Sequence, residues 1–174
     1  MSFNRGFRVI GLCLLVVFGL VACGNSDEPA LDLPPLTLPA PPTPVFAGTC
    51  TDTSTLERWL QTIQFQQRDF VELMDSAVSG GRASEALYLN VEQMALLRNR
   101  ISEEPAPDCA ENLHREILGI MQEVLDGFQE YVNGDNRNLN SLVENGHSRF
   151  NALLPQQTEL LNRLDQQFQG QSGN

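Results

Sequence analysis

The strongest constraint on folding is a helical pattern of apolar residues that runs from Ser54 to Phe168. Apolar side chains recur every three or four residues, which places them on one face of an α-helix. No stretch of this region shows the two-residue alternation of a half-buried strand. Glycines 80 and 81, Pro105 and Gly134 divide the pattern into four segments of helical length. The chain is therefore predicted to be all-α.

The four predicted helices are long and their connections are short. They cover about residues 54–79, 83–103, 108–133 and 135–168, and Pro155 should kink the last one or divide it into two. Segments of this kind favour an up-down-up-down four-helix bundle over residues 50–170, followed by a frayed end at 171–174. The side chains expected in its core are Leu56, Trp59, Leu60, Ile63, Phe70, Met74, Ala77, Val78, Leu87, Val91, Met94, Leu97, Ile101, Leu113, Ile117, Met121, Val124, Phe128, Tyr131, Leu139, Leu142, Phe150, Leu153, Leu161, Leu164 and Phe168.

Two cysteines lie within the predicted bundle. Cys50 precedes the first helix, and Cys109 lies at the start of the third. Both positions fall at the same end of an up-down-up-down bundle, so we expect a disulfide between them. Its loop of about 60 residues would stabilise the fold by roughly 4 kcal/mol. The alternative, a redox-active pair, lacks the C-x-x-C spacing.

Residues 1–22 have the features of an export signal. Arg5 and Arg8 give a charged start, and Val9–Val21 is an apolar run too short to span a bilayer. The run ends in Leu20, Val21, Ala22 and Cys23, which resemble the lipobox of bacterial lipoproteins. The resemblance implies that Cys23 becomes the mature N-terminus and carries a diacylglyceryl group and usually a further acyl chain, such as palmitate. Ordinary signal-peptide cleavage and an uncleaved membrane anchor are the alternatives.

The lipobox resemblance also implies a location. The protein would be a membrane-anchored lipoprotein of the bacterial cell envelope, facing the extracytoplasmic side. Two or more acyl chains hold a protein stably on a bilayer, whereas one does not. An Asp directly after the lipidated cysteine would resemble lipoproteins that are retained at the inner membrane, and this chain has Gly24 there instead. The choice between inner and outer membrane stays open.

Residues 23–49 form a proline-rich stretch between the lipobox and the first helix. Its prolines are Pro29, Pro34, Pro35, Pro39, Pro41, Pro42 and Pro44. Proline favours extended polyproline II, so we expect a disordered, semi-rigid spacer that reaches up to roughly 75 Å. The alternative is a docking site for a proline-recognition module.

The charge of the mature chain excludes one class of partner. All 11 basic residues are arginines, and two of them lie in the leader, so nine arginines oppose 22 acidic residues for a formal charge of −13. A surface this acidic repels phosphate backbones, so no nucleic-acid binding is expected.

Two E-x-x-H pairs, Glu111 with His114 and Glu144 with His147, resemble half of a di-metal site in a four-helix bundle. In a hairpin that turns near Gly134, the two histidines are offset by roughly 10 Å along the helix axis. Both must reach metals about 4 Å apart in such a site. We therefore expect surface or boundary histidines, with no metal and no cofactor.

No motif supports catalysis: the chain lacks G-x-S-x-G and, once the disulfide forms, a free thiol in the bundle. We expect a non-enzymatic binding or scaffolding module, anchored through Cys23, with an envelope protein as its partner. The alternative is a small-ligand or metal-binding bundle that uses His114 and His147. The turn from Tyr131 to Asp135 resembles one in small uncharacterised exported helical-bundle proteins of bacteria, and that resemblance implies no activity. Phe65 falls off the apolar stripe of the first helix, so it either packs in an ordinary way or marks a contact patch.

Overall fold

A computed structural model describes residues 33–48, 50, 53–79 and 84–171. They form the helices α1 (Thr53–Val78), α2 (Glu85–Glu103), α3 (Glu111–Val132), α4 (Leu139–Ala152) and α5 (Leu154–Gln171), with the 3₁₀ helix η1 (Asp108–Ala110) before α3. These described residues include no strand, so the all-α prediction is confirmed. The predicted leader, Cys23 and residues 172–174 lie outside the described residues.

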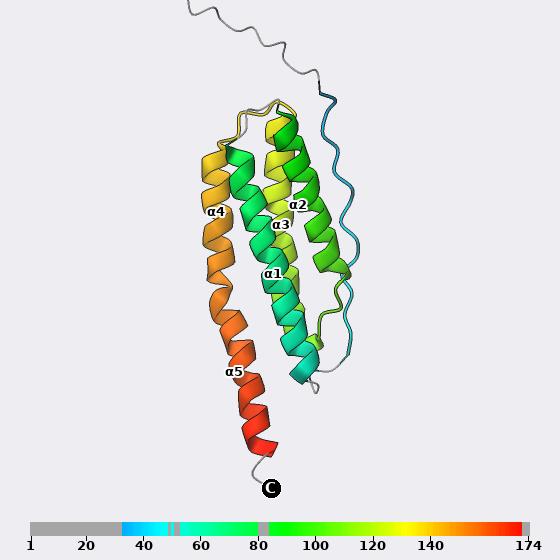
Figure 1. Ribbon diagram of the computed structural model, residues 1–174, viewed down its shortest axis with the longest axis vertical. Helices are drawn as coiled ribbons and strands as arrows, with labels where there is room; N and C mark the ends of the chain where they lie inside the picture. Colours follow the sequence, from blue (N-terminus) through cyan, green and yellow to red (C-terminus); the bar gives the residue numbers. More distant parts are fainter. Residues whose placement is uncertain (1–32, 49, 51–52, 80–83, 172–174) are drawn as a thin grey trace, which may run out of the picture. The chain divides into compact units, whose positions relative to one another are not determined.

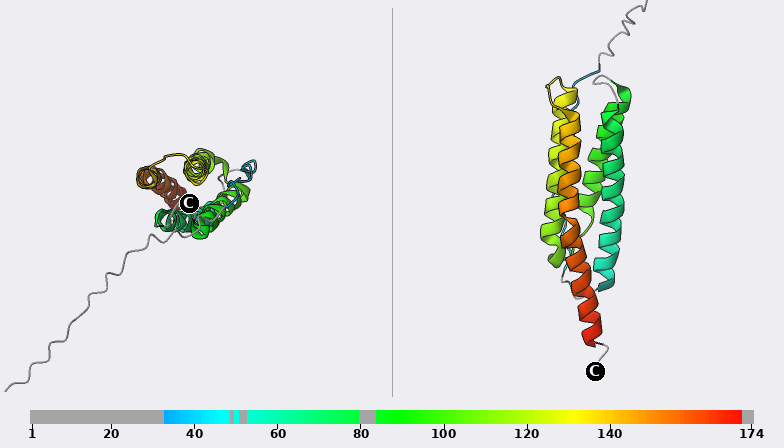
Figure 2. Two further views of the ribbon diagram at one scale, coloured as in Figure 1. Left: turned by 90° about the horizontal axis from the view of Figure 1, so that it is seen from above. Right: turned by 90° about the vertical axis from the view of Figure 1, so that its left-hand side faces the viewer.

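Four helices pack side by side around one core (Figures 1 and 2). Helix α1 contacts α2 and α4, and α3 contacts the same two helices from the other side. Helix α5 follows α4 and continues past the first turn of α1, so its last turns lie beyond the other helices (Figure 2). Within the described ranges, no helix is both long and apolar enough to cross a membrane.

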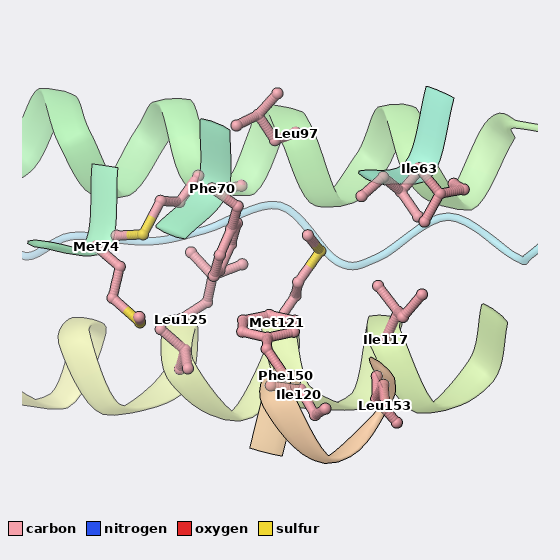
Figure 3. Close-up of a cluster of buried hydrophobic side chains, with 14 of the residues drawn as sticks. Ile63, Phe70, Met74, Leu97, Ile117, Ile120, Met121, Leu125, Phe150 and Leu153 are labelled. Atoms are coloured by element: carbon pink, nitrogen blue, oxygen red, sulfur yellow. The ribbon is translucent and has the colours of Figure 1, made fainter. Parts of the chain in front are cut away.

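The core is filled by apolar side chains of α1, α2, α3 and α4, with Leu153 from the break between α4 and α5 (Figure 3). Every side chain expected there from α1, α2 and α3 is buried except Val78 and Tyr131, which are half-buried. Phe70 of α1 meets Phe150 of α4 edge to face, with ring centroids 6.0 Å apart. This pair links the first and fourth helices across the centre of the bundle.

The last predicted helix is divided at Leu153, as expected near Pro155. The Leu153 amide donates to the Phe150 carbonyl, and α5 then begins at Leu154. Pro155 lies in the first turn of α5, where a missing N–H costs no helical hydrogen bond.

The break also changes which face of α5 is buried. Leu160 is 7% exposed and Leu161 is 39% exposed, so the core position predicted for Leu161 is wrong. The buried stripe continues from Leu153 through Gln157 instead. The Gln157 side chain accepts a hydrogen bond from Gln64 and donates one to Gln67, both on α1.

Residues 33–48, which we name the strap, lie along α2 and α3 (Figure 1). Leu36 of the strap is only 5% exposed, and Leu38 and Phe46 also pack against the core. The expectation of a free spacer over the whole of residues 23–49 is therefore wrong for this part. The extended conformation was predicted, and its attachment to the bundle was not.

Two glycines offer a matched test of packing in the bundle. A Cβ at Gly146 of α4 would meet the Met74 sulfur at 3.0 Å and a Val124 methyl at 3.2 Å, whereas one at Gly119 of α3 would meet nothing within 4 Å. Gly146→Leu should lower the free energy of unfolding by about 1–3 kcal/mol through overpacking. Gly119→Ala should raise it by about 0.5–1 kcal/mol through helix propensity. Urea denaturation measures both, and a neutral Gly146→Leu would contradict the close approach of α4 to α1 and α3.

Candidate functional site

The chemistry of the strap follows from its prolines. Six of its 16 residues are proline and have no backbone N–H. The strap therefore has 16 backbone carbonyl acceptors but only ten N–H donors, so a surface that holds it must supply donors of its own. Side chains of α2 and α3 supply them.

The first part of the strap is held at the end of α3. The Asn133 amide accepts from the Leu36 N–H at 2.9 Å and donates to the Leu36 carbonyl at 3.1 Å. Gln129 donates to the same carbonyl at 3.1 Å. Tyr88 of α2 donates its hydroxyl to the Pro34 carbonyl at 2.9 Å. Leu36 is thus fixed by both its backbone groups and its buried side chain.

Arg98 of α2 holds the middle of the strap. Its side chain is 1% exposed, and one Nη donates to the Pro39 carbonyl at 2.9 Å. The remaining donors reach Asn99 and Gln122. Burial lowers the pKa of Arg98, while the negative charge of Asp126 acts in the opposite direction. The guanidinium has hydrogen-bond partners on three sides, as a buried charge requires.

The last part of the strap pairs with the segment between α2 and α3. Ser102 donates its hydroxyl to the Pro42 carbonyl at 2.8 Å and accepts from the Val45 N–H at its own carbonyl. Ala47 donates to Ala106, and Ala106 donates to Val45, at 2.9 and 3.0 Å. These bonds form a single parallel bridge centred on Phe46.

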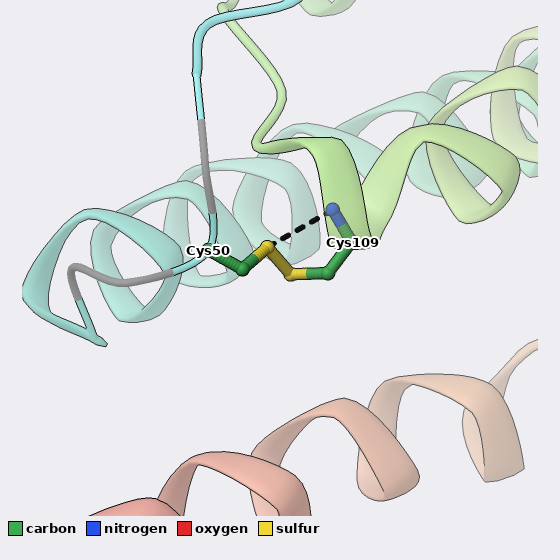
Figure 4. The surroundings of a disulfide bond; sticks show 2 residues. All are labelled: Cys50 and Cys109. Carbon is green, nitrogen blue, oxygen red and sulfur yellow. Dashed lines mark hydrogen bonds between the residues drawn. A yellow bond between two sulfur atoms is a disulfide. The ribbon is translucent and has the colours of Figure 1, made fainter.

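The disulfide closes the site just after the strap (Figure 4). Cys50 and Cys109 are bonded with their Cα atoms 5.8 Å apart, which confirms the predicted pair. The Cys109 N–H donates to the Cys50 sulfur at 2.9 Å. Gly48 has a φ of +70°, a region that favours glycine, and its carbonyl accepts from the Asp108 N–H. The chain is therefore fixed to the start of α3 before α1 begins.

His114 lies beneath the strap in an apolar environment. Its side chain is fully buried between the rings of Phe46 and Trp59, each with its centroid 5.9 Å away. Neither ring nitrogen has a hydrogen-bond partner among the described residues. Burial, followed by the neighbouring charge of Arg115, lowers the pKa of His114 to about 4. The imidazole is therefore neutral at pH 7, and the expectation of a surface or boundary histidine is wrong here.

His147 lies elsewhere, on the surface of α4. Its Nε2 is 2.7 Å from an Asp75 carboxylate oxygen of α1. His114 contacts α1 at Trp59, 16 residues before Asp75, which corresponds to about 24 Å along the helix. The two histidines do not share a site. No three His, Cys, Asp or Glu side chains form a metal-binding group in the described part of the chain.

Phe65, which falls off the apolar stripe of the first helix, is exposed in the structure. Its side chain is 56% exposed, and the Arg68 guanidinium lies 4.7 Å from its ring centroid. Leu154, which lines the neighbouring groove of α1, α4 and α5, is 52% exposed. Phe65 belongs to α1 and Leu154 to α5, whereas the side chains that hydrogen-bond to the strap belong to α2 and the end of α3.

The residues that bind the strap were not predicted from the sequence. One signal was present: Arg98 follows Val91 and Met94 at helical spacing and precedes Ile101, so it lies on the apolar face of α2. A charge at such a position implies a partner inside the fold. Leu36, Leu38 and Phe46 were a second signal, because a free spacer gains nothing from apolar residues.

The chain matches no protein-family model and no curated protein, and no solved structure matches it either. The α2–α3 surface can recognise an extended backbone through its carbonyls. The site brings together a neutral histidine and a disulfide, and neither is placed as a nucleophile with a base.

The Asn133 contact can be tested by hydrogen exchange. Asn133→Ala removes both hydrogen bonds to the Leu36 backbone, so the Leu36 amide should exchange about 10-fold faster or more. The Ala47 amide, held by the bridge to Ala106, should keep its protection. Asn136→Ala, which changes an exposed amide in the same connection, is the matched control. Unchanged exchange at Leu36 would contradict this contact.

The buried His114 should make stability depend on pH. The unfolded histidine binds a proton near pH 6.5 and the folded one only near pH 4, so stability is complete above pH 6.5 and falls as the pH drops toward 4. Between pH 7 and pH 5 the expected loss in unfolding free energy is about 2 kcal/mol. His114→Leu should remove this part of the pH dependence, and the surface variant His147→Gln should retain it. Urea titrations at both pH values measure the free energy of unfolding. An equal loss of this free energy between pH 7 and pH 5 in wild type and His114→Leu would be evidence against the buried neutral state.

Proposed function

We propose that this protein is a lipid-anchored component of the bacterial cell envelope, attached to the membrane through Cys23. The observation that carries the proposal is the sequence Leu20, Val21, Ala22 and Cys23 at the end of a short apolar run after two arginines. The Cys50–Cys109 disulfide supports it, because disulfides persist in exported proteins and are rare in the cytosol. Residues 1–22 act as the signal peptide in this account.

The folded part acts as a non-enzymatic binding or scaffolding module that faces the extracytoplasmic side. Its arrangement is an up-down-up-down bundle, which is supported by the contacts of α1 with α2 and α4 and of α3 with the same two helices. Its partner is an envelope protein. The exposed Phe65 and Leu154 support such a role, because apolar side chains at the surface contribute to interfaces.

Mass spectrometry of the mature N-terminus tests the anchor. The account expects residues 1–22 to be absent and Cys23 to carry diacylglyceryl and a further acyl chain. Cys23→Ser should leave the membrane fraction while keeping its helical content. An unmodified Cys23, or an intact leader, would contradict lipidation.

Affinity capture from membranes tests the binding role separately. Wild-type protein and a Phe65→Ser, Leu154→Ser variant, both lipidated, should differ in the proteins they retain. Retention of no envelope protein by the wild type would contradict the scaffolding role without affecting the anchor.

A further inference from the structure

We propose that the strap determines which end of the bundle faces the bilayer: the α3–α4 connection, residues 133–138, lies against the membrane, and the disulfide end points away from it. This inference rests on the proposed lipidation of Cys23. It departs from what the chain order alone suggests, because residues 23–49 lead to α1, which begins at the disulfide end.

The strap changes this expectation because the chain first contacts the bundle at the α3–α4 end, before it reaches the disulfide end. The first contacts are made by the Pro34 and Leu36 carbonyls with Tyr88, Gln129 and Asn133. From there the strap runs along α3 to the Cys50–Cys109 bond at its other end. Only about ten residues separate Cys23 from the strap, and such a segment spans at most about 35 Å.

The length of α3 makes the two ends distinguishable. Helix α3 has 22 residues, which corresponds to about 33 Å between the two ends of the bundle. With the strap bound, the anchor can reach the Asn133 end directly. The disulfide end can approach the bilayer only if the residues between Cys23 and the strap extend almost fully along the length of the bundle.

The charges of the two ends favour the same orientation. The connection of residues 133–138 contains one acidic residue, Asp135, and one basic residue, Arg137, which pairs with Glu130. At the opposite end, residues 103–111 contain four acidic residues, Glu103, Glu104, Asp108 and Glu111, and only Glu111 has a salt bridge to another described residue, Arg115. Anionic headgroups repel the acidic end and tolerate the balanced one.

Energy transfer to a labelled membrane tests the orientation. The full lipidated protein is placed in vesicles of phosphatidylethanolamine and phosphatidylglycerol that carry an acceptor-labelled lipid. A donor is attached to Asn136→Cys in one sample and to Asn112→Cys in the other. Both asparagines are exposed, and they lie near opposite ends of α3. The Asn136 donor should show the higher transfer efficiency.

A strap variant provides the control. Leu36→Asp places a charge at a buried position and should detach the first part of the strap. The segment between Cys23 and the first contact with the bundle then becomes longer. Circular dichroism verifies that the helices are retained, and the difference between the two donors should then decrease. Equal transfer from both donors in the strap-intact protein would contradict the orientation, and so would a difference that Leu36→Asp leaves unchanged. Failure of the protein to associate with vesicles would contradict the proposed lipidation instead.

Discussion

The structure depends on side-chain donors of α2 and α3 that hydrogen-bond to the carbonyls of a proline-rich segment. The strap is poorly suited to a continuous strand, since six of its 16 residues are prolines without an N–H, and it forms only a single bridge, at Phe46. Five side chains donate to the strap carbonyls. Three belong to α2: Tyr88, Arg98 and Ser102. The other two, Gln129 and Asn133, lie near the end of α3. A single such bond contributes only about 1 kcal/mol, so the attachment relies on several of them and on the buried Leu36.

Arg98 and the strap depend on each other. A guanidinium at the centre of an apolar helix face is costly unless its donors are satisfied, and the Pro39 carbonyl satisfies one of them. The bridge at Phe46 and the disulfide then fix the chain at the other end of α3. Phe46 also covers His114, so the neutral imidazole and the last part of the strap belong to one packed cluster.

The helices could be predicted because their signal is local. The expected starts at residues 54 and 83 lie within two residues of Thr53 and Glu85, and the expected disulfide formed. The docked strap could not be predicted in the same way, since proline favours an extended chain whether it is bound or free. Its attachment is decided by partners such as Asn133, 97 residues from Leu36. The error at Leu161 has a local cause: the break at Leu153 changed the phase of the following helix.

The central claim is that the strap is part of the folded bundle and not a free tether. Nuclear Overhauser contacts test it most directly, because they report distances of a few ångströms in solution. The account predicts cross-peaks between the Phe46 and His114 rings, whose centroids lie 5.9 Å apart, and between the Leu36 amide and the Asn133 side chain. Random-coil shifts for residues 33–48 and no such cross-peaks, in a protein whose helices are folded, would contradict it.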